Sequence, residues 1–488
     1  MNQILKLGKK CLRFPKNYET NITTKNTTNK IPRAKSLPLI GTKIDLIKGG
    51  LGTRLHEFID LRHQELGNIF MENFGTTDLL FVSDAELIRK LFINLEGKYP
   101  AHILPDPWLL YEKLYGQKRG LLFMDGEEWW QNRRIMNKLL LKDNANSWIQ
   151  DSVTKTITIF IEHWKERSKH GIVINDVASE LYNLSTKVII QVLIGNTNPP
   201  QGKHYDELLT MFTESVKKIF ETTTKLYGIP VNWCHRFNLK VWQDFKECVD
   251  LSLLLGNKLL KEILAVKNSS GLIKKLGDEK MDEITMSRII IDFIIAAGDT
   301  TAYTSLWIFY LLSQNRNEIT EIRSKKHTYI PFVIKEAMRL YPVAPFLTRI
   351  LPEDSVVGEY SVKKGTPIIA SIYTSGRNEQ YFSKPEEFLP YRWDRSDERK
   401  GKLKNHIPFA SLPFALGARS CVGRKIAMAQ LTELIWQVVD NFDFRLLRGE
   451  AGPELLGLQG NSTLFGEVDA SVLLDAGLQS QALLLPCA

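Results

Sequence analysis

The cysteine with the most distinctive surroundings is Cys421, which lies in Phe414-Ala-Leu-Gly417-Ala-Arg419-Ser-Cys421-Val-Gly423. By average residue frequencies, a chance match to F-x-x-G-x-R-x-C-x-G in a chain of this length is on the order of one in ten thousand. Glycines on both sides allow a tight turn, and backbone N–H groups there can hydrogen-bond a thiolate. A thiolate bound to iron donates electron density that promotes cleavage of the O–O bond. The alternative interpretation is a buried structural cysteine.

Two candidate catalytic residues, Asp299 and Thr300, lie in Ala296-Ala-Gly-Asp-Thr-Thr301, within the long apolar stretch 289–312. A threonine hydroxyl inside a helix can compete for backbone hydrogen bonds and hold a water molecule. Asp299 and Thr300 could then relay protons during catalysis. The alternative is an ordinary Thr-rich helix interior. Because acidic residues are costly in a lone membrane span, we expect this stretch to be a buried helix.

Together these motifs resemble those of the cytochrome P450 family, and the resemblance covers residues 32–447, most of a domain. It implies a mainly α-helical fold with small β-sheets, which encloses haem b beside a long central helix. It also implies that Cys421 is the axial ligand of the haem iron, in a loop formed with Phe414, Gly417 and Gly423. The expected activity is monooxygenation with O2.

The resemblance implies further contacts with the haem. Arg419 is expected to meet a haem propionate, as are Trp129, Arg133 and Arg349. The spacing W-x-x-x-R places Trp129 and Arg133 on one helix face. Cationic donors are the expected partners of a buried dianion. Taken singly, Trp129 could be a core residue and Arg133 a surface charge.

A structural triad is implied by Glu336-Ala-Met-Arg339 and by Arg392 within Phe388-Leu-Pro-Tyr-Arg392-Trp393. Residues Glu336 and Arg339 share one helical face. A buried carboxylate between two guanidinium groups must be fully hydrogen-bonded. We interpret these three residues as structural and not catalytic.

Basic residues near the thiolate loop resemble the mitochondrial class of P450s, in which such residues meet an acidic [2Fe-2S] ferredoxin. They are Arg424 and Lys425, together with Lys335; Pro331 stands where a further basic residue is usual. The expected partners are mitochondrial ferredoxin and its reductase. The alternative is a solvated charge pair that helps solubility.

The first 17 residues are basic and amphipathic and contain no acid, which is typical of a mitochondrial transit peptide. A disordered basic N-terminus is the alternative. We therefore expect residues 1–30 to be a transit peptide, residues 31–448 the P450 domain, and residues 449–488 an atypical C-terminal tail. The expected location is the matrix side of the inner mitochondrial membrane, with peripheral membrane contact.

Composition excludes some classes of protein. The net charge of +9 is spread widely and no nucleic-acid-binding motif is present, so we expect no nucleic-acid partner. Five scattered cysteines argue against a disulfide framework or a structural zinc site.

The substrate is expected to be apolar and steroid-like. Residues 291–305 and 341–377 most resemble the insect ecdysteroid 2-hydroxylases; another mitochondrial steroid or secosteroid hydroxylase, such as an ecdysteroid 22-hydroxylase, is the alternative. By the same resemblance, residues 343–348 should face the distal pocket, although ordinary core packing would explain them equally. Residues 104–121 and 205–236 should form pocket walls and a membrane-dipping access region.

Two departures from the family pattern bear on activity. The interval from Thr300 to Glu336 is short, which predicts a missing surface helix, and residues 449–488 lack the extended pattern of the usual pocket-lining hairpin. A haem-binding isoform that is catalytically silent is therefore a further alternative. A peroxide-driven rearrangement enzyme would not need Asp299, Thr300 or a ferredoxin surface.

Overall fold

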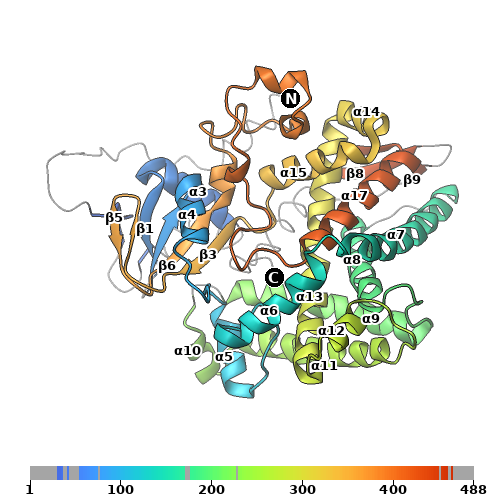
Figure 1. The fold of residues 1–488 in the computed structure, drawn as a ribbon, viewed down its shortest axis with the longest axis horizontal. Helices are drawn as coiled ribbons and strands as arrows, with labels where there is room; N and C mark the ends of the chain where they lie inside the picture. Colours follow the sequence, from blue (N-terminus) through green and yellow to red (C-terminus); the bar gives the residue numbers. More distant parts are fainter. Residues whose placement is uncertain are drawn as a thin grey trace.

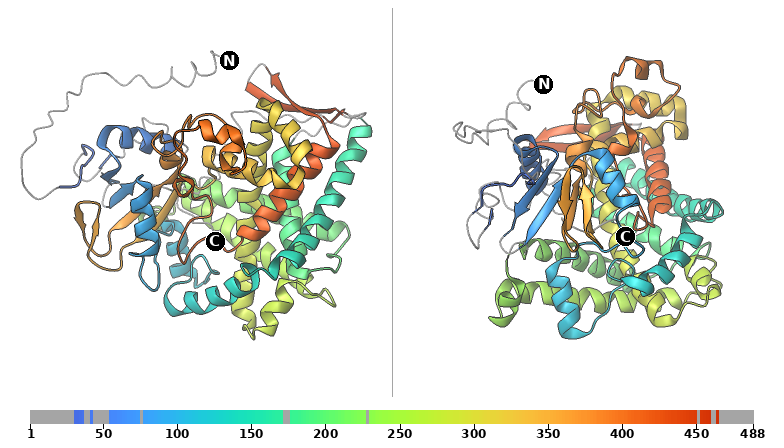
Figure 2. Two further views of the ribbon diagram at one scale, coloured as in Figure 1. Left: turned by 45° about the horizontal axis from the view of Figure 1, so that its top comes forward. Right: turned by 60° about the vertical axis from the view of Figure 1, so that its left-hand side comes forward.

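The computed structural model of the chain describes residues 30–36, 41–42, 54–74, 77–170, 176–226, 229–449, 452–459 and 463–464. The predicted transit peptide, apart from Lys30, and the tail beyond Leu464 lie outside these residues. The fold is mainly helical with small β-sheets, as predicted. Figure 1 shows a sheet-containing part, with α3 and α4 beside the strands, next to a larger helical part; Figure 2 shows the same division from two other directions.

The helical part contains most of the hydrophobic core. The α-helices of the described chain are α3 Leu55–Leu66, α4 Ala85–Ile93, α5 Asp106–Tyr115, α6 Gly126–Leu140, α7 Ala145–Lys169, α8 Val177–Ile194, α9 Lys203–Lys225, α10 Val231–Arg236, α11 Lys240–Leu264, α12 Leu272–Asp278, α13 Glu283–Gln314, α14 Arg316–Lys325, α15 Ile330–Leu340, α16 Ile372–Gly376 and α17 Arg424–Asn441. Short 3-10 helices are η2 Lys326–Thr328, η3 Pro390–Trp393, η4 Glu398–Lys402 and η5 Pro408–Ala410.

The strands form three small sheets. Their bounds are β1 Ile69–Asn73, β2 Asp78–Val82, β3 Phe346–Ile350, β4 Ser355–Val357, β5 Tyr360–Val362, β6 Pro367–Ser371, β7 Phe444–Gly449, β8 Gly452–Gln459 and β9 Thr463–Leu464. The first sheet has the order β1-β2-β6-β3, in which β2 and β6 are parallel and the other pairs antiparallel. Gly358 turns the chain between β4 and β5 with a φ of +62°, a conformation that favours glycine.

Helix α13 runs through the middle of the molecule (Figure 1) and positions the predicted catalytic residues. Asp282, the residue before its first turn, caps the helix, because its carboxylate accepts a hydrogen bond from the Thr285 N–H at 2.9 Å. Among the described residues, α13 alone is long and apolar enough to span a membrane, but most of that stretch is buried inside the protein. The expectation of a buried helix is confirmed.

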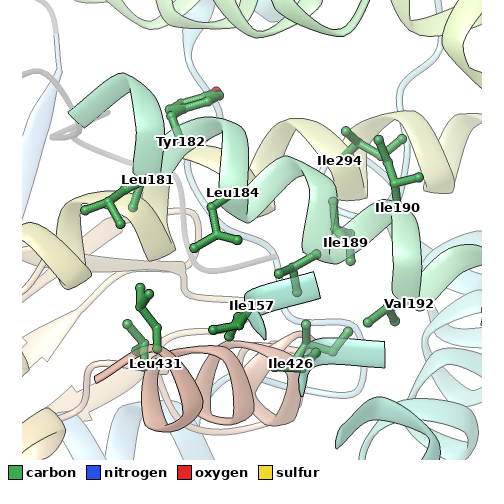
Figure 3. Packing of buried hydrophobic residues seen from close by; sticks show 14 of the residues in the cluster. Ile157, Leu181, Tyr182, Leu184, Ile189, Ile190, Val192, Ile294, Ile426 and Leu431 are labelled. Carbon is green, nitrogen blue, oxygen red and sulfur yellow. The ribbon is translucent and has the colours of Figure 1, made fainter. Parts of the chain in front are cut away.

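Helices α7, α8, α13 and α17 pack together through aliphatic side chains. Figure 3 shows Leu184 and Ile189 of α8 pointing toward Ile426 and Leu431 of α17, with Ile157 of α7 between them. Buried aliphatic side chains of this size each contribute about 1.5–3 kcal/mol through removal of apolar surface from water. This packing holds α17, and the Cys421 loop directly before it, against the central helices.

Two predictions about connecting segments have different outcomes. Between α13 and α15 the structure has only α14 and the turn η2, in accord with the short interval seen in the sequence. Residues 452–459, predicted to lack an extended pattern, instead form β8, which pairs with β7 and β9. That prediction was wrong for these residues, because β8 pairs antiparallel with β7 and places Gly452 opposite Gly449.

Candidate active site

The Cys421 loop is fixed by its own backbone and by α4. The Cys421 N–H donates to the Phe414 carbonyl at 2.9 Å, which closes the loop on itself. Gly417 has a φ of +80°, and a Cβ there would collide with the Phe92 carbonyl and the Glu96 carboxylate. A side chain at Gly423 would come within 3.9 Å of the Cys421 Sγ. Gly417 therefore requires a glycine both for its conformation and for lack of space, whereas a Cβ at Gly423 would make only an ordinary van der Waals contact.

A cavity lies between this loop and α13. Its lining is mostly apolar and includes Cys421 from one side and Ala296, Ala297, Asp299 and Thr300 from the other. The structure thus brings together two motifs that are more than 100 residues apart in the sequence. Further lining residues come from α8, α9, α15 and α17, among them Ile189, Phe220, Met338 and Leu431.

Helix α13 presents a polar pair to this cavity. The Thr300 Oγ1 donates to the Ala296 carbonyl at 3.0 Å, within the helix. Asp299 is buried, and burial raises its pKa to about 7, although the Lys217 charge opposes the shift. A carboxyl group with a pKa near neutrality can both give and take a proton at physiological pH.

Glu336, Arg339 and Arg392 meet in the fully buried interior. The Glu336 Oε1 accepts hydrogen bonds from Arg339 Nη2 at 2.8 Å and from Arg392 Nε at 2.9 Å. The Glu336 Oε2 accepts from Arg339 Nε and from Trp393 Nε1, each at 2.9 Å. Arg339 also donates to the carbonyls of Gly376 and Pro385. The network ties α15 to η3 and to the segment that leads to the Cys421 loop.

Arg133, Arg349 and Arg419 are buried beside the Cys421 loop. The Arg133 Nη2 donates to the Ser420 carbonyl, and Arg419 lies 4.3 Å from the ring centre of Trp129. Burial, together with the Arg349 charge, lowers the pKa of Arg133 and of Arg419 to about 10.

This arginine cluster is suited to an anionic group. The buried Arg133 Nε has no hydrogen-bond partner, and Asp125, which pairs with Arg419, is two-thirds exposed. Two haem propionates would neutralise the excess positive charge and satisfy the open donor. The residues present therefore fit haem, with Cys421 facing the cavity and the arginines at its edge.

Two buried residues of this region were not found from the sequence. The Glu96 carboxylate accepts from Arg349 Nε and from the Ala418 N–H, each at 2.7 Å, and so connects the arginine to the Cys421 loop. His102 is buried beside Arg419 and Arg349; burial and these cations lower its pKa well below the usual value. Their partners Ala418 and Arg419 lie in the motif around Cys421, but Glu96 and His102 themselves lie in no recognised motif. The sequence therefore gave no signal for these two residues.

The predicted pocket walls need correction. No residue of 104–121 is in the cavity lining; Leu122, just beyond, is. Within 205–236 only Phe220 contributes, and within 343–348 only Val343 and Ala344 do. Leu347 packs instead in the core beside the first sheet, because side chains of β3 alternate between the two faces of that sheet.

The three basic residues predicted to meet a ferredoxin differ in exposure. Arg424 and Lys335 are exposed. Lys425 is less exposed, because its Nζ donates to the Lys142 carbonyl at 2.9 Å. Two of the three cations are thus available at the surface for a partner.

Comparisons with known proteins agree with this site. The family model named Cytochrome P450 matches residues 31–467. The chain is 36% identical over 441 residues to "Cytochrome P450 315a1, mitochondrial" of Drosophila melanogaster, covering 86% of this chain and 84% of the relative. It is 27% identical to the mitochondrial 1,25-dihydroxyvitamin D(3) 24-hydroxylase of Rattus norvegicus, with 87% and 85% covered. It is 26% identical to the mitochondrial cholesterol side-chain cleavage enzyme of Ovis aries, with 80% and 79% covered. The chain therefore belongs to the cytochrome P450 family, in its mitochondrial class, and is a P450 monooxygenase.

Proposed function

We propose that this enzyme hydroxylates an ecdysteroid at carbon 2, with O2 and with electrons from a mitochondrial [2Fe-2S] ferredoxin. The observation that carries the proposal is the mostly apolar cavity that brings Cys421 and the Asp299–Thr300 pair to the same space. Such a cavity suits a large apolar substrate with few polar contacts. Steroid chemistry is supported by the names of the relatives, and the position of attack by the resemblance of residues 291–305 and 341–377 to the ecdysteroid 2-hydroxylases.

In this proposal haem b is held by Cys421 on the iron and by Arg133, Arg349, Arg419 and Trp129 around its propionates. When bound, haem supplies the activation of O2 that hydroxylation of a C–H bond requires. The protein contributes orientation and electrostatics. Buried guanidinium groups hold the anionic edge, and the loop glycines keep the backbone close to the sulfur.

Asp299 and Thr300 would move protons in the distal part of the cavity. The Thr300 hydroxyl donates to a helix carbonyl, so its oxygen keeps acceptor capacity on the cavity side. Asp299, with a pKa of about 7, can give up a proton and take up another at neutral pH. Apolar neighbours such as Phe293 and Ala297 limit the access of bulk water.

The electron donor would dock over Arg424, three residues after Cys421, and over Lys335 of α15; both side chains are exposed. Cations on an open face steer an acidic partner and determine its orientation more than they add affinity. We place the enzyme on the matrix side of the inner mitochondrial membrane, where this donor system operates.

Peripheral contact with that membrane would come from α10 and the residues after it. Trp233 is 67% exposed and Phe237 is 65% exposed, and Leu239 follows. Arg236 and Lys240 are exposed beside them. Exposed aromatic side chains next to cations are suited to the interface of an anionic bilayer. Replacing Trp233 and Phe237 with serine should reduce flotation with cardiolipin-containing vesicles, whereas replacing the equally exposed Ile159 of α7 should not.

The central experiment incubates the haem-loaded enzyme with ferredoxin, its reductase and NADPH, and with ecdysteroid precursors that each lack one hydroxyl group. We expect a new hydroxyl group at carbon 2, identified by mass spectrometry and NMR. Hydroxylation of the side chain at carbon 22 would contradict this assignment and support the ecdysteroid 22-hydroxylase. Absence of every product, with a normal thiolate spectrum, would support a catalytically silent isoform.

A further inference from the structure

Glu96 follows α4 and joins two parts of the active site. Its Oε2 accepts from the Arg349 Nε of β3, and its Oε1 accepts from the Ala418 N–H, each at 2.7 Å. Ala418 lies three residues before Cys421 in the loop. Both carboxylate oxygens are therefore used, and the side chain is only 6% exposed.

The loop packs closely on this carboxylate. A Cβ at Gly417 would be 2.6 Å from one Glu96 oxygen and 2.8 Å from the other, so the backbone of the loop lies directly against the charged group. Arg349 also donates to the Leu416 carbonyl at 3.1 Å, and its guanidinium lies 4.2 Å from the ring centre of Phe92 in α4. The loop is thus held from β3 and from the end of α4.

The buried charges around the loop do not cancel. Three arginines there are each at most 5% exposed: Arg133, Arg349 and Arg419. Glu96 is buried among them, and its charge opposes the lowering of the pKa of Arg133 and of Arg349 by burial. Among the described residues around the loop, three buried cations and one buried anion leave an excess of two positive charges.

Two further titratable groups do not change this balance. His102 is neutral at physiological pH, because burial and the nearby cations lower its pKa well below the usual value. Asp125 lies 3.3 Å from Arg419, but its side chain is 66% exposed, so water weakens the effect of its charge on the interior.

From this arrangement we infer that Glu96 balances the charge of the haem site and positions the Cys421 loop, so that the arginine cluster matches the two propionates of haem b. The inference rests on the proposed function in one respect: the propionates must lie at the arginine cluster. Glu96 is a positioning residue, because it does not line the cavity and acts through Arg349 and Ala418.

A fixed charge at this place should influence the reduction of the haem iron. Reduction adds one negative charge, so a nearby buried anion disfavours it and a nearby buried cation favours it. Charge and hydrogen bonding near the sulfur are among the features by which a protein sets the potential of a haem. Glu96 should therefore keep the potential lower than the three arginines alone would make it.

The test compares two substitutions of Glu96 in the haem-loaded protein. Glu96→Gln removes the charge, and the amide NH2 group places a donor against either the Ala418 N–H or the Arg349 Nε. Glu96→Asp keeps the charge on a side chain that is one CH2 group shorter. Glu318→Gln is the matched control, because Glu318 is a buried carboxylate of α14 that accepts from the Tyr329 hydroxyl group at 2.7 Å and does not line the cavity.

The first readout is the ratio of ferrous to ferric haem at a fixed potential equal to the wild-type midpoint. In Glu96→Gln this ratio should rise about threefold or more, because a buried anion is gone. Glu96→Asp and Glu318→Gln should stay close to the wild type. Arg349→Gln should lower the ratio to about one third or less, because Glu96 then lacks its partner cation. A disturbance of packing alone gives no reason for opposite signs.

The second readout is the rate at which the reduced, CO-bound protein loses its thiolate band in urea below the unfolding transition. Glu96→Gln and Glu96→Asp should both lose the band about threefold faster or more, because each weakens a hydrogen bond that holds the loop. Glu318→Gln should keep the wild-type rate. Charge and position are thereby separated, since Glu96→Asp should change only the second readout.

Haem dimethyl ester, which has no propionate charges, tests the premise by itself. The wild type should lose the ester to apomyoglobin about 10-fold faster or more than it loses haem b, because buried guanidinium groups would then lack their anions. Equal rates would show that the propionates lie elsewhere, and the proposed haem contacts, with this inference, would be wrong.

The remaining outcomes separate the hypotheses. If the wild type discriminates against the ester but Glu96→Gln keeps the wild-type ratio and band-loss rate, the role of Glu96 is wrong and the haem contacts stand. If Glu96→Gln retains no haem, Arg349→Gln decides, because an unchanged or raised ratio there overturns the charge balance. None of these readouts uses a steroid, so the opposite shifts with no hydroxylated ecdysteroid would support the role of Glu96 and contradict the substrate assignment.

Discussion

The Glu336 Oε1 lies 2.9 Å from the Arg392 Nε, and both side chains are completely buried although they are 56 residues apart in the sequence. Burial alone would raise the pKa of Glu336, but Arg339 and Arg392 lower it below the usual glutamate value. Every polar atom that these residues turn toward one another is hydrogen-bonded, which is the condition under which a buried charge is tolerated.

Replacing Glu336 with glutamine should therefore destabilise the fold. The substitution leaves two buried guanidinium groups without their anion, at a cost of about 3–5 kcal/mol. Thermal unfolding and haem content after purification measure the effect. Because the folded-state pKa of Glu336 is lowered, its contribution is complete above the ordinary glutamate pKa and is lost as pH falls through the lower folded value. A Glu336→Gln protein of normal stability and haem content would contradict this interpretation of the triad.

Replacing Cys421 with serine should abolish the red-shifted absorption of the reduced, CO-bound protein, because that band requires a thiolate on the iron. Cys248→Ser is the matched control, since Cys248 is a free cysteine on α11, away from the cavity lining. Persistence of the band in Cys421→Ser would refute the assignment of the ligand.

Replacing Thr300 with alanine should leave haem binding intact and raise the peroxide formed per NADPH about 10-fold or more, because proton transfer loses one of its partners. The pH dependence follows from Asp299. Its raised pKa, about 7, means that the acid form is present below pH 7 and is lost as pH rises through 7. Coupling should accordingly decline above neutrality in the wild type. Ser305→Ala is the control, because Ser305 is a buried hydroxyl of α13 that donates to the Thr301 carbonyl and does not line the cavity. Equal coupling in wild type and Thr300→Ala would remove Thr300 from the catalytic residues.

The sequence predicted the elements that depend on local pattern better than the contacts that depend on the fold. The long apolar stretch 289–312 predicted the buried helix α13 correctly. Residues 372–376 form α16, and the Arg377 guanidinium that follows lies 3.9 Å from the ring centre of Tyr373. Ser371, just before α16, is held by His63 at 2.8 Å, a contact that no local pattern could indicate.

The same distinction holds at the site. Cys421, Asp299 and Thr300 belong to short motifs with fixed spacing. Tyr182 and Lys217 are separated from Asp299 by more than 80 residues and lie on helices whose patterns resemble those of ordinary amphipathic helices. Tyr182 meets Gly298, the neighbour of Asp299, only once α8 and α13 have packed, so sequence spacing carries no signal for this contact.

A second buried ion pair, between Arg119 and Asp292, should be as important to stability as the triad. The Arg119 Nε and Nη2 both donate to Asp292 Oδ1, at 2.8 and 2.5 Å, and the Gly120 N–H donates to Asp292 Oδ2 at 2.6 Å. Replacing Asp292 with asparagine should lower the free energy of unfolding by about 3 kcal/mol, because Arg119 stays buried without its anion.

The matched control for Asp292 is Glu128→Gln. Glu128 pairs with Arg288 in the same region, but its side chain is exposed. Removing an exposed ion pair changes stability by about 0–1 kcal/mol. Similar losses in the two variants, measured by chemical denaturation, would show that burial does not distinguish these pairs.

The last prediction concerns the ferredoxin surface. Arg424 and Lys335 are exposed on α17 and α15, and Arg424 is only three residues from Cys421, so a partner that docks there has a short electron path. Changing both residues to glutamate should slow ferredoxin-dependent reduction about 10-fold or more at low salt, since steering by charge acts on the association rate. The salt dependence should become flatter, because screening weakens long-range attraction between the partners.

Lys425→Glu alone should have a smaller effect on association, since that side chain already donates to the Lys142 carbonyl. Lys364→Glu, in the turn between β5 and β6, is the control for net charge. Chemical reduction and the CO-bound spectrum should remain normal in every variant, because neither uses the docking surface. Equal ferredoxin-driven rates in the wild type and the double variant would place the docking surface elsewhere on the protein.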